Sequence, residues 1–265
     1  MKELEDFIAQ KLLNLKAIKL QARNPFEWNT GWLSPMYFDS RKILSYHMRN
    51  IIKVMQAPDG TAVNVKRYHV PRGFNSVVYS LGLRKPKGRR AYEYPERLLQ
   101  NGIDTPEPIA YIEERRYGLL GYTYFVSVQC DYGHTLYEVG DAPEGTYEEL
   151  AAQLAAFAAT MHEKNIMHKD FTPGNILFYC DDDGHYHFSL VDTNRMHFGP
   201  VDIRMGLNNL KRMWGPKRFF QLLIRAYAEH RHADADEAEA TALKWRKRFW
   251  SHYLKKYQVP FKVEL

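Results

Sequence analysis

The stretch His168-Lys169-Asp170-Phe171-Thr172-Pro173-Gly174-Asn175 decides the fold. It places an aspartate two residues after a histidine and an asparagine five residues after that aspartate. From average residue frequencies, such a pattern arises by chance in a chain of this length about one time in a hundred. Phosphoryl transfer needs a carboxylate that takes the proton of the acceptor hydroxyl, and an amide oxygen is a hard ligand that suits Mg²⁺. The pattern therefore predicts Asp170 as the catalytic base and Asn175 as a magnesium ligand.

The segments on either side of this loop support the same interpretation. Thr146, with a glutamate three residues later, predicts a capping box for a helix that runs to about Lys164 and has one apolar face. Two strands are predicted after the loop, over residues 175–180 and 186–192, with an acidic turn between them. The second strand ends on Asp192, where a phosphotransferase of this kind needs its second metal-binding carboxylate.

The first half of the chain is rich in predicted strands, and the second half is rich in predicted helices. The predicted elements before residue 130 are a hairpin (51–56 and 61–67), a helix (87–101) and two strands (111–114 and 122–129). From Met205 onward the pattern is helical throughout. The order predicts an α+β, protein-kinase-like fold with a strand-rich N-lobe and a helical C-lobe.

Two residues of the first half complete the predicted nucleotide site. Lys66 falls late on the second strand of the hairpin, where its ammonium group can reach the α and β phosphates of ATP. Its expected acidic partner is Glu93, preferred over Glu96 because it falls in the middle of the next helix. With Asn175 and Asp192 these residues form the predicted cofactor site for ATP and Mg²⁺.

Ordinary structural roles explain each of these residues when it is taken alone, because loop acids and surface lysines are common. Four roles in the correct order on the correct elements favour the kinase-like interpretation. For His168, a hydrogen bond to the backbone is expected rather than proton donation. His185 and His187 flank the acidic turn as metal ligands would, but alternation along a strand is the favoured explanation.

Composition limits the partners and the compartment. The 265 residues carry a net charge of +6, and the cations concentrate in the segment 84–90 and near the C-terminus, which indicates an anionic partner such as phosphate or lipid. No zinc-finger spacing or RNA-binding signature is present, so no nucleic-acid partner is expected. No run of eighteen apolar residues and no secretory signal is visible. Cys130 and Cys180 are far apart and lack the spacing of a zinc site or a disulfide scaffold. A cytoplasmic location is expected.

Residues 50–265 resemble the bacterial lipopolysaccharide core kinases, which phosphorylate Kdo or heptose. The stretches that carry the resemblance are Asn64-Val65-Lys66-Arg67-Tyr68, Arg84-Lys85-Pro86-Lys87-Gly88, Thr105-Pro106-Glu107-Pro108, the His168–Asn175 loop and Val191-Asp192-Thr193-Asn194-Arg195. The resemblance implies ATP, Mg²⁺ and a sugar hydroxyl of lipopolysaccharide as acceptor, at the inner face of the cytoplasmic membrane. Asp192 is followed by Thr-Asn-Arg rather than Phe-Gly, and no Ala-Pro-Glu segment follows, so a sugar is favoured over a peptide.

Residues 1–48 resemble a different family, the orotate phosphoribosyltransferases. The stretches are Ala17-Ile18-Lys19-Leu20, Asn24-Pro25-Phe26 and Ser34-Pro35-Met36-Tyr37. The two adjacent acids and the Thr-Gly that such an enzyme needs after an apolar run are missing, so phosphoribosyl transfer is not expected. The predicted domains are therefore this segment (1–48), a kinase N-lobe (49–130) and a kinase C-lobe (131–265), and natural fusion and chimera both remain open.

The N-terminal segment raises a question about activity. It occupies the place of the first kinase strand and the glycine-rich phosphate loop, and the chain has no Gly-x-Gly-x-x-Gly. Residues 30–39 are the candidate replacement strand, with Asn29, Thr30 and Gly31 as an improvised phosphate lid. Two alternatives thus stay open beside the sugar kinase: a pseudokinase or nucleotide-binding module, and an aminoglycoside-type phosphotransferase that acts on a small molecule.

Overall fold

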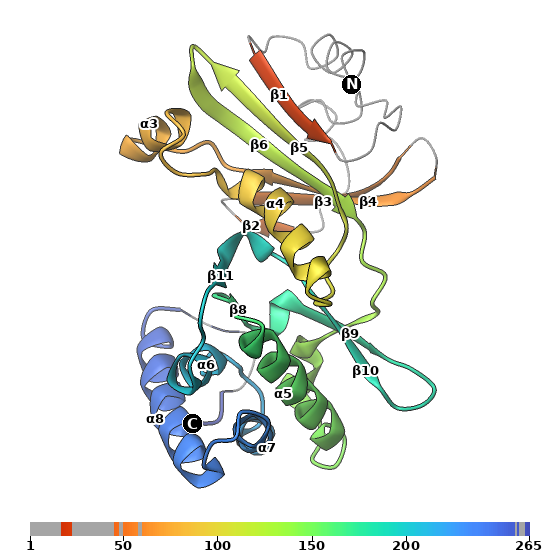
Figure 1. Cartoon of the computed structure of the whole chain (residues 1–265), viewed down its shortest axis with the longest axis vertical. Helices are drawn as coiled ribbons and strands as arrows, with labels where there is room; N and C mark the ends of the chain where they lie inside the picture. Colours follow the sequence, from red (N-terminus) through yellow and green to blue (C-terminus); the bar gives the residue numbers. More distant parts are fainter. Residues whose placement is uncertain (1–16, 23–44, 48–49, 58–59, 258, 260–262) are drawn as a thin grey trace. The chain divides into compact units, whose positions relative to one another are not determined.

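The computed structural model describes residues 17–22, 45–47, 50–57, 60–257, 259 and 263–265 (Figure 1). The chain divides into two compact units. The first holds Met1–Gln100 and Pro106–Cys130, and the second holds Asn101–Thr105 and Asp131–Leu265. The first unit is built on a sheet and the second mainly on helices. The α+β class expected from the sequence is confirmed.

The first unit contains a six-stranded antiparallel sheet in the order β1-β5-β6-β4-β3-β2. Its strands are β1 (Ala17–Ala22), β2 (Ser45–His47), β3 (Asn50–Gln56), β4 (Ala62–Tyr68), β5 (Pro108–Arg116) and β6 (Leu119–Val128). The predicted hairpin is confirmed as β3–β4, and the two later strands are longer than predicted. The phosphoribosyltransferase-like segment supplies β1, which forms the sheet edge beside β5 (Figure 1).

Helix α4 (Lys87–Gln100) covers one face of this sheet. A Cβ at Gly88 would come within 2.9 Å of side-chain atoms of Tyr111 and Thr123, so the close approach of helix and sheet requires glycine there. The other face carries an apolar core in which Val63, Val65, Ile112, Tyr124 and Val126 are buried. Strand alternation therefore separates a face that packs on α4 from a face that forms the core cluster.

A short helix that the sequence did not predict lies between β4 and α4. Helix α3 (Phe74–Ser80) has no buried residue. Its C-terminal end is tied to the sheet, because Ser80 Oγ accepts the amide hydrogen of Leu120 at 2.8 Å and the Ser80 carbonyl accepts from Arg115 at 3.1 Å. The helix is thus attached to the sheet but buries none of its own residues.

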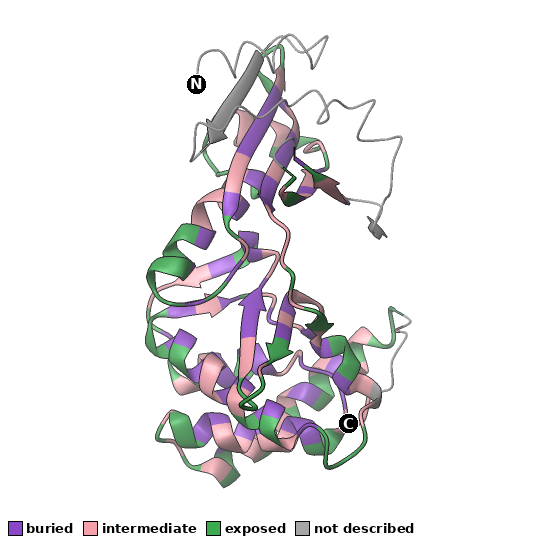
Figure 2. Cartoon of the chain, turned by 90° about the vertical axis from the view of Figure 1, so that its right-hand side faces the viewer, coloured by how far each residue is buried: buried purple, intermediate pink, exposed green. Residues whose placement is uncertain are grey.

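Four helices organise the second unit: α5 (Glu148–Glu163), α6 (Ile203–Leu210), α7 (Lys217–His230) and α8 (Ala235–Tyr253). Helix α7 packs against both α5 and α8. Figure 2 shows buried and exposed residues alternating along these helices, as amphipathic helices require. The helical character expected from Met205 onward is confirmed. No helix in the described parts of the chain is both long and apolar enough to span a bilayer.

The predicted capping box at the start of α5 is wrong. The hydroxyl of Thr146 donates to the Pro143 carbonyl at 2.6 Å instead of capping the helix. The Glu148 carboxylate accepts the amide hydrogens of Gly145 and Tyr147, which precede the helix, at 2.9 and 3.1 Å. An acid in the first turn thus fixes the chain that enters α5, and its charge is favourable at the positive end of the helix dipole.

Short strands and 3₁₀ turns hold the loop of interest within the second unit. They are β7 (His134–Thr135), the 3₁₀ helix η2 (Leu136–Asp141), β8 (Ile166–His168), η3 (Pro173–Asn175), β9 (Ile176–Cys180), β10 (Tyr186–Leu190), η4 (Thr193–Arg195) and β11 (Met196–Phe198). Strands β7, β9 and β10 form one small sheet, and β8 pairs with β11. The predicted hairpin after the loop is confirmed as β9–β10.

The segment Asn101–Thr105 belongs to the helical unit although its chain neighbours on both sides belong to the sheet unit. The Leu190 amide donates to the Asp104 carbonyl at 2.9 Å, and the Thr105 hydroxyl donates to the Leu190 carbonyl at 2.7 Å. Both bonds fix the end of β10, two residues before Asp192.

Candidate active site

The loop that follows β8 is anchored by a buried histidine. His168 has no exposed surface, its Nδ1 accepts the amide hydrogen of Asp170 at 3.1 Å, and its Nε2 donates to the Val191 carbonyl at 3.1 Å. Burial lowers the pKa of His168, which keeps the ring neutral as these two bonds require. The ring thus ties the Asp170 loop to the residue before Asp192, a structural role of the kind expected from the sequence.

Asp170 lies between two arginines. Its Oδ1 accepts from Arg212 at 2.5 Å and its Oδ2 accepts from Arg195 at 3.2 Å. The Asp170 side chain keeps 26% of its surface exposed, so an incoming hydroxyl can reach it. The arginines fix the direction of the carboxylate and place positive charge where a phosphoryl group would carry negative charge.

Neither arginine had been assigned a role from the sequence. They follow Asp170 by 25 and 42 positions, in η4 and after α6, and the fold brings them to the loop. The Thr-Asn-Arg that replaces Phe-Gly after Asp192 was the only available signal for Arg195.

The hydrogen bonds of Asn175 leave its side-chain carbonyl oxygen as the group suited to bind a metal ion. Its Nδ2 donates to the Asp170 carbonyl at 2.9 Å and to the Thr172 hydroxyl at 3.3 Å. Its backbone carbonyl accepts the Val191 amide hydrogen at 3.0 Å. Since both hydrogen bonds of the side chain come from the amide nitrogen, the Oδ1 atom is the one suited to coordinate Mg²⁺.

Asp192 lies at a sharp backbone turn. Its φ of 56° is in the left-handed region, which is uncommon outside glycine and is concentrated at functional sites. One carboxylate oxygen, Oδ1, accepts from Asn194 Nδ2. Hydrogen bonds therefore join Asp170 and Asn175 to each other and, through His168, to Val191, the residue that precedes Asp192.

This group has the chemistry of a nucleotide-bound magnesium site. In the described part of the chain, no cluster of three His, Cys, Asp or Glu side chains could hold a metal ion by itself. One amide oxygen and one carboxylate suit Mg²⁺, which is usually held by one or two protein groups together with water and substrate phosphates. Asn175 and Asp192 would hold that ion, and it would neutralise charge on the phosphates.

Lys66 and Glu93 both lie in the sheet unit. Lys66 pairs with Phe125 across the sheet, and Phe125 pairs with Tyr111 beneath α4, so Lys66 lies on the face that α4 covers. Its ammonium group is 5.3 Å from the centre of the Tyr68 ring. This position on a central strand is the one expected of a phosphate-binding lysine.

Glu93 contacts other cations in this structure. Its two carboxylate oxygens accept from Lys85 at 2.6 Å and from Arg89 at 2.7 Å. The expected Lys66–Glu93 ion pair stays a prediction for the nucleotide-bound state. The proposed replacement strand (30–39) and the phosphate lid at Asn29, Thr30 and Gly31 lie outside the described residues.

A helical unit that carries Asp170 and Asn175 on one anchored loop and Asp192 after the following β9–β10 hairpin, together with a sheet unit that has a covering helix, defines the protein-kinase-like fold. The "Lipopolysaccharide kinase (Kdo/WaaP) family" model matches residues 41–257, and the chain belongs to this family. A solved structure titled "WaaP in complex with acyl carrier protein" is similar over 88% of this chain and 98% of that chain, with a TM-score of 0.56 and 17% identity. At that identity the likeness concerns the fold alone.

The curated relatives match only a short segment. The orotate phosphoribosyltransferases of Bacteroides thetaiotaomicron and Phocaeicola vulgatus are both 58% identical over 55 residues, which is 20% of this chain. The chain spans 26% of the length of these relatives. The resemblance to a phosphoribosyltransferase segment is therefore confirmed, and it is confined to a minor part of the chain.

Proposed function

We propose that this protein transfers the terminal phosphoryl group of ATP to a sugar hydroxyl of the lipopolysaccharide core, on Kdo or heptose. The observation that carries the proposal is the hydrogen-bonded arrangement that joins Asp170 and Asn175 to the residue before Asp192, in a chain of the lipopolysaccharide kinase family. Asp170 accepts the proton of the attacking hydroxyl, and Asn175 and Asp192 position the magnesium nucleotide. Lys66, with Glu93 as its acidic partner, is assigned to bind the nucleotide phosphates.

Radiolabel transfer from ATP to lipopolysaccharide core tests this function. Wild-type protein transfers label and Asp170→Ala does not, whereas equal transfer by the variant would exclude Asp170 as the base. A panel that includes aminoglycosides separates the sugar kinase from a phosphotransferase that acts on small molecules. Label on an aminoglycoside and none on the core saccharide would replace the proposed acceptor.

The alternative of a catalytically silent nucleotide-binding module has its own test. A ligand at a hundred times its dissociation constant stabilises a protein by about 2.7 kcal/mol, so ATP with Mg²⁺ raises the melting temperature if the site binds nucleotide. Nucleotide stabilisation without label transfer to any acceptor would establish the silent module. Stabilisation that is lost in Asp192→Ala assigns the binding to this site.

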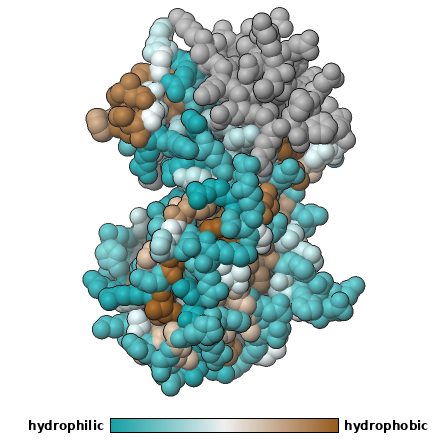
Figure 3. Space-filling model, viewed as in Figure 1, coloured by the Kyte–Doolittle hydropathy of each residue, from teal (hydrophilic) through white to brown (hydrophobic). Residues whose placement is uncertain are grey.

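A membrane contact is the second part of the proposal, and α3 with the segment after it supports it. Four large apolar side chains are exposed here, Phe74 (81%), Val77 (44%), Leu81 (69%) and Leu83 (76%). Figure 3 shows them as a hydrophobic protrusion at the position that α3 has in Figure 1. The cationic segment Arg84–Arg90 follows directly. Apolar side chains beside cations fit an anionic bilayer surface, and this supports a peripheral contact with the inner face of the cytoplasmic membrane.

Vesicle sedimentation tests this contact. Binding to phosphatidylcholine vesicles that contain phosphatidylglycerol is expected, with weaker binding at high salt and on pure phosphatidylcholine. Leu81→Ser with Leu83→Ser should reduce binding. Tyr179→Ser with Leu254→Ser removes two exposed apolar residues of the helical unit and should leave it unchanged. Equal loss in both pairs would show that no particular surface mediates the contact.

A further inference from the structure

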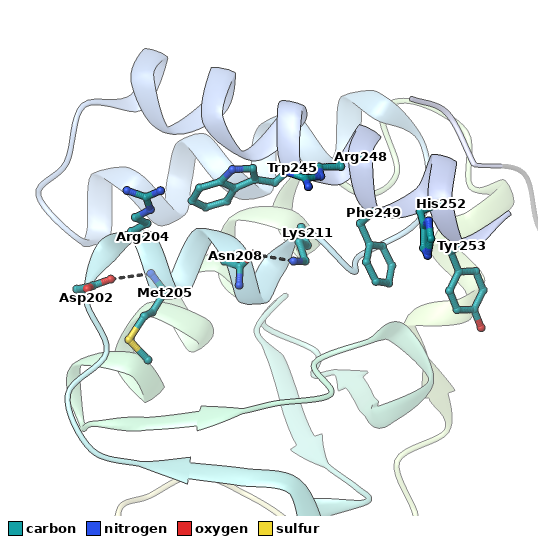
Figure 4. Close-up of a pocket in the computed structure, with 10 residues that line it drawn as sticks. All are labelled: Asp202, Arg204, Met205, Asn208, Lys211, Trp245, Arg248, Phe249, His252 and Tyr253. Atoms are coloured by element: carbon teal, nitrogen blue, oxygen red, sulfur yellow. Dashed lines mark hydrogen bonds between the residues drawn. The ribbon is translucent and has the colours of Figure 1, made fainter. Parts of the chain in front are cut away.

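A pocket of about 820 Å³ opens between α6 and α8 in the helical unit (Figure 4). Its volume falls within the range of small-molecule sites. Cationic and aromatic side chains line it together. Those that matter here are Arg204, Lys211, Arg248, His252, Trp245 and Phe249.

The positive charge of this pocket has no counter-charge from the chain. Among the residues that the structure describes, Arg204, Lys211, Arg248 and His252 form no ion pair with a carboxylate. Asp202 is the one acidic residue of the lining, and its Oδ1 accepts the Met205 amide hydrogen at 2.6 Å as the cap of α6. An anion is the ligand that such a field attracts.

The environment of Lys211 disfavours its positive charge. Its Nζ donates to Asn208 Oδ1 at 2.7 Å and lies 5.8 Å from the centre of the Phe249 ring. Burial, together with the nearby Arg212 and Arg248 guanidinium groups, lowers the pKa of Lys211. A negatively charged ligand would offset both effects.

The pocket is next to the proposed catalytic base. Phe249 lines the pocket, and the Arg212 guanidinium carbon lies 5.5 Å from the centre of its ring. The same Arg212 contacts the Asp170 carboxylate at 2.5 Å. The Arg212 side chain thus lies between Phe249 in the pocket and the Asp170 carboxylate. A mono- or disaccharide bound between α6 and α8 is long enough to extend from the pocket to Asp170.

The aromatic side chains indicate which anion fits. Trp245 and Phe249 offer ring faces of the kind on which the apolar face of a sugar packs, and Arg204 lies 5.7 Å from the centre of the Trp245 ring. A simple inorganic ion would use the cations and leave the rings and most of the volume unused. A sugar that carries a charged group would contact the cations and the aromatic rings and would also fill the volume of the pocket.

We propose that the pocket between α6 and α8 binds a negatively charged group, phosphate or carboxylate, on the acceptor sugar and so presents a hydroxyl of the same molecule to Asp170. The inference rests on the proposed function and deepens it, because it restricts the acceptor to anionic saccharides. Lys211 and Arg248 contact the charged group, and Phe249 contacts the sugar ring.

Calorimetric titration of the full chain without nucleotide tests the pocket independently of catalysis. The probes are glucose 6-phosphate, glucuronate and glucose. At least one charged sugar should bind more tightly than glucose, and the preference between the two identifies the group. Lys211→Gln with Arg248→Gln should weaken that binding about tenfold or more, because charge-assisted hydrogen bonds are lost.

Lys247→Gln is the matched control, since it removes a cation from the same helix at an exposed position outside the pocket. It should leave the titration unchanged. Equal affinity for the charged and neutral sugars, or equal loss in Lys247→Gln, would overturn the proposal. So would a chain that binds none of these sugars but binds an acidic protein such as acyl carrier protein through Lys211 and Arg248, because the pocket would then be a protein-docking site.

Kinetics separates the pocket from the proposed reaction. If the chain is a lipopolysaccharide kinase, Lys211→Gln should raise the KM for the acceptor about tenfold and leave the KM for ATP unchanged. If label transfer fails altogether, the titration still decides whether the pocket takes anionic sugars.

Discussion

A carboxylate lies between two cations in each unit of this protein, and the two arrangements differ. In the helical unit, Asp170 is on a loop that buried His168 fixes, with Arg195 and Arg212 on its two oxygens. In the sheet unit, Glu93 is a half-buried residue of α4, and its partners Lys85 and Arg89 have 53% and 35% of their side-chain surface exposed, close to the 50% and 31% of Arg195 and Arg212. The difference is that the Asp170 backbone is anchored by a buried side chain.

Exposed ion pairs contribute little to stability, whereas a loop with buried hydrogen bonds is costly to rearrange. The difference indicates that Asp170 is held in one position and that Glu93 can change partners. If Lys66 takes Glu93 as its partner when nucleotide binds, Glu93 has to exchange partners, whereas Asp170 is in place beforehand.

The largest effect expected is from Asp170→Asn, which keeps the size of the side chain and removes its charge. Phosphoryl transfer should fall about a thousandfold because proton acceptance is lost. The measurement is the rate of label transfer to the core saccharide. Asp183→Asn, an exposed acid in the same unit, is the control and should transfer at the wild-type rate. A small loss in Asp170→Asn would mean that the carboxylate only positions the two arginines.

The stability of the helical unit, which holds Asp170, should also depend on pH. Burial, reinforced by the charge of Arg231, lowers the pKa of His162 to about 4, and its Nδ1 is 2.8 Å from the Tyr227 hydroxyl. The unfolded chain takes up a proton near pH 6.5 and the folded chain does not, so stability is lost as pH falls below about 6.5. Burial also lowers the pKa of His168, so this residue adds to the loss of stability at low pH.

Between pH 7 and pH 5, His162 alone should remove about 2 kcal/mol from the free energy of unfolding. Urea denaturation at the two pH values is the measurement. In His162→Gln the difference between them should shrink, while His185→Gln, with its exposed ring, should keep the wild-type difference. Stability that is flat from pH 7 to pH 5 would contradict neutral buried histidines.

A smaller effect is expected from Glu93→Gln. If Glu93 orients Lys66 in the nucleotide-bound state, the KM for ATP should rise about tenfold, as for the loss of one charge-assisted contact. Folding should be only slightly affected because both ion pairs that are lost are partly exposed to solvent. Glu96→Gln on the same helix is the control. An unchanged KM for ATP in Glu93→Gln would mean that Glu93 serves only Lys85 and Arg89.

The smallest effect is expected from Lys85→Gln. Its ion pair with Glu93 is exposed, so the free energy of unfolding should change by less than about 0.5 kcal/mol. Label transfer should be maintained, since Glu93 keeps Arg89 or moves to Lys66. A stability loss well above 1 kcal/mol would show that Glu93 is as firmly held as Asp170 and would remove the difference between the units.

The sequence predicts what is local in this protein. The His168–Asn175 loop, the β3–β4 and β9–β10 hairpins and α4 each depend on residues within a short window, and all are present. The partners of Asp170 could not be predicted, because Arg195 and Arg212 reach it only through the fold. The same holds for the α6–α8 pocket, whose two walls are formed by segments far apart in the sequence.

The errors have equally physical causes. The cap of α5 was assigned to Thr146 by its spacing, but the Thr146 hydroxyl turns back to the Pro143 carbonyl and the helix begins two residues later, at Glu148. Helix α3 was missed because it faces no core, and so its apolar residues lack the periodicity of a buried face.

The short stretch Asn101–Thr105 has a practical consequence. The polypeptide passes from one unit to the other after Gln100, again after Thr105 and once more after Cys130. A fragment cloned from Asp131 onward would lack the Asp104 carbonyl and the Thr105 hydroxyl that fasten Leu190. A fragment meant to keep the helical unit intact should therefore start before Asn101 and include β5 and β6, or Asp192 will follow an unsecured strand.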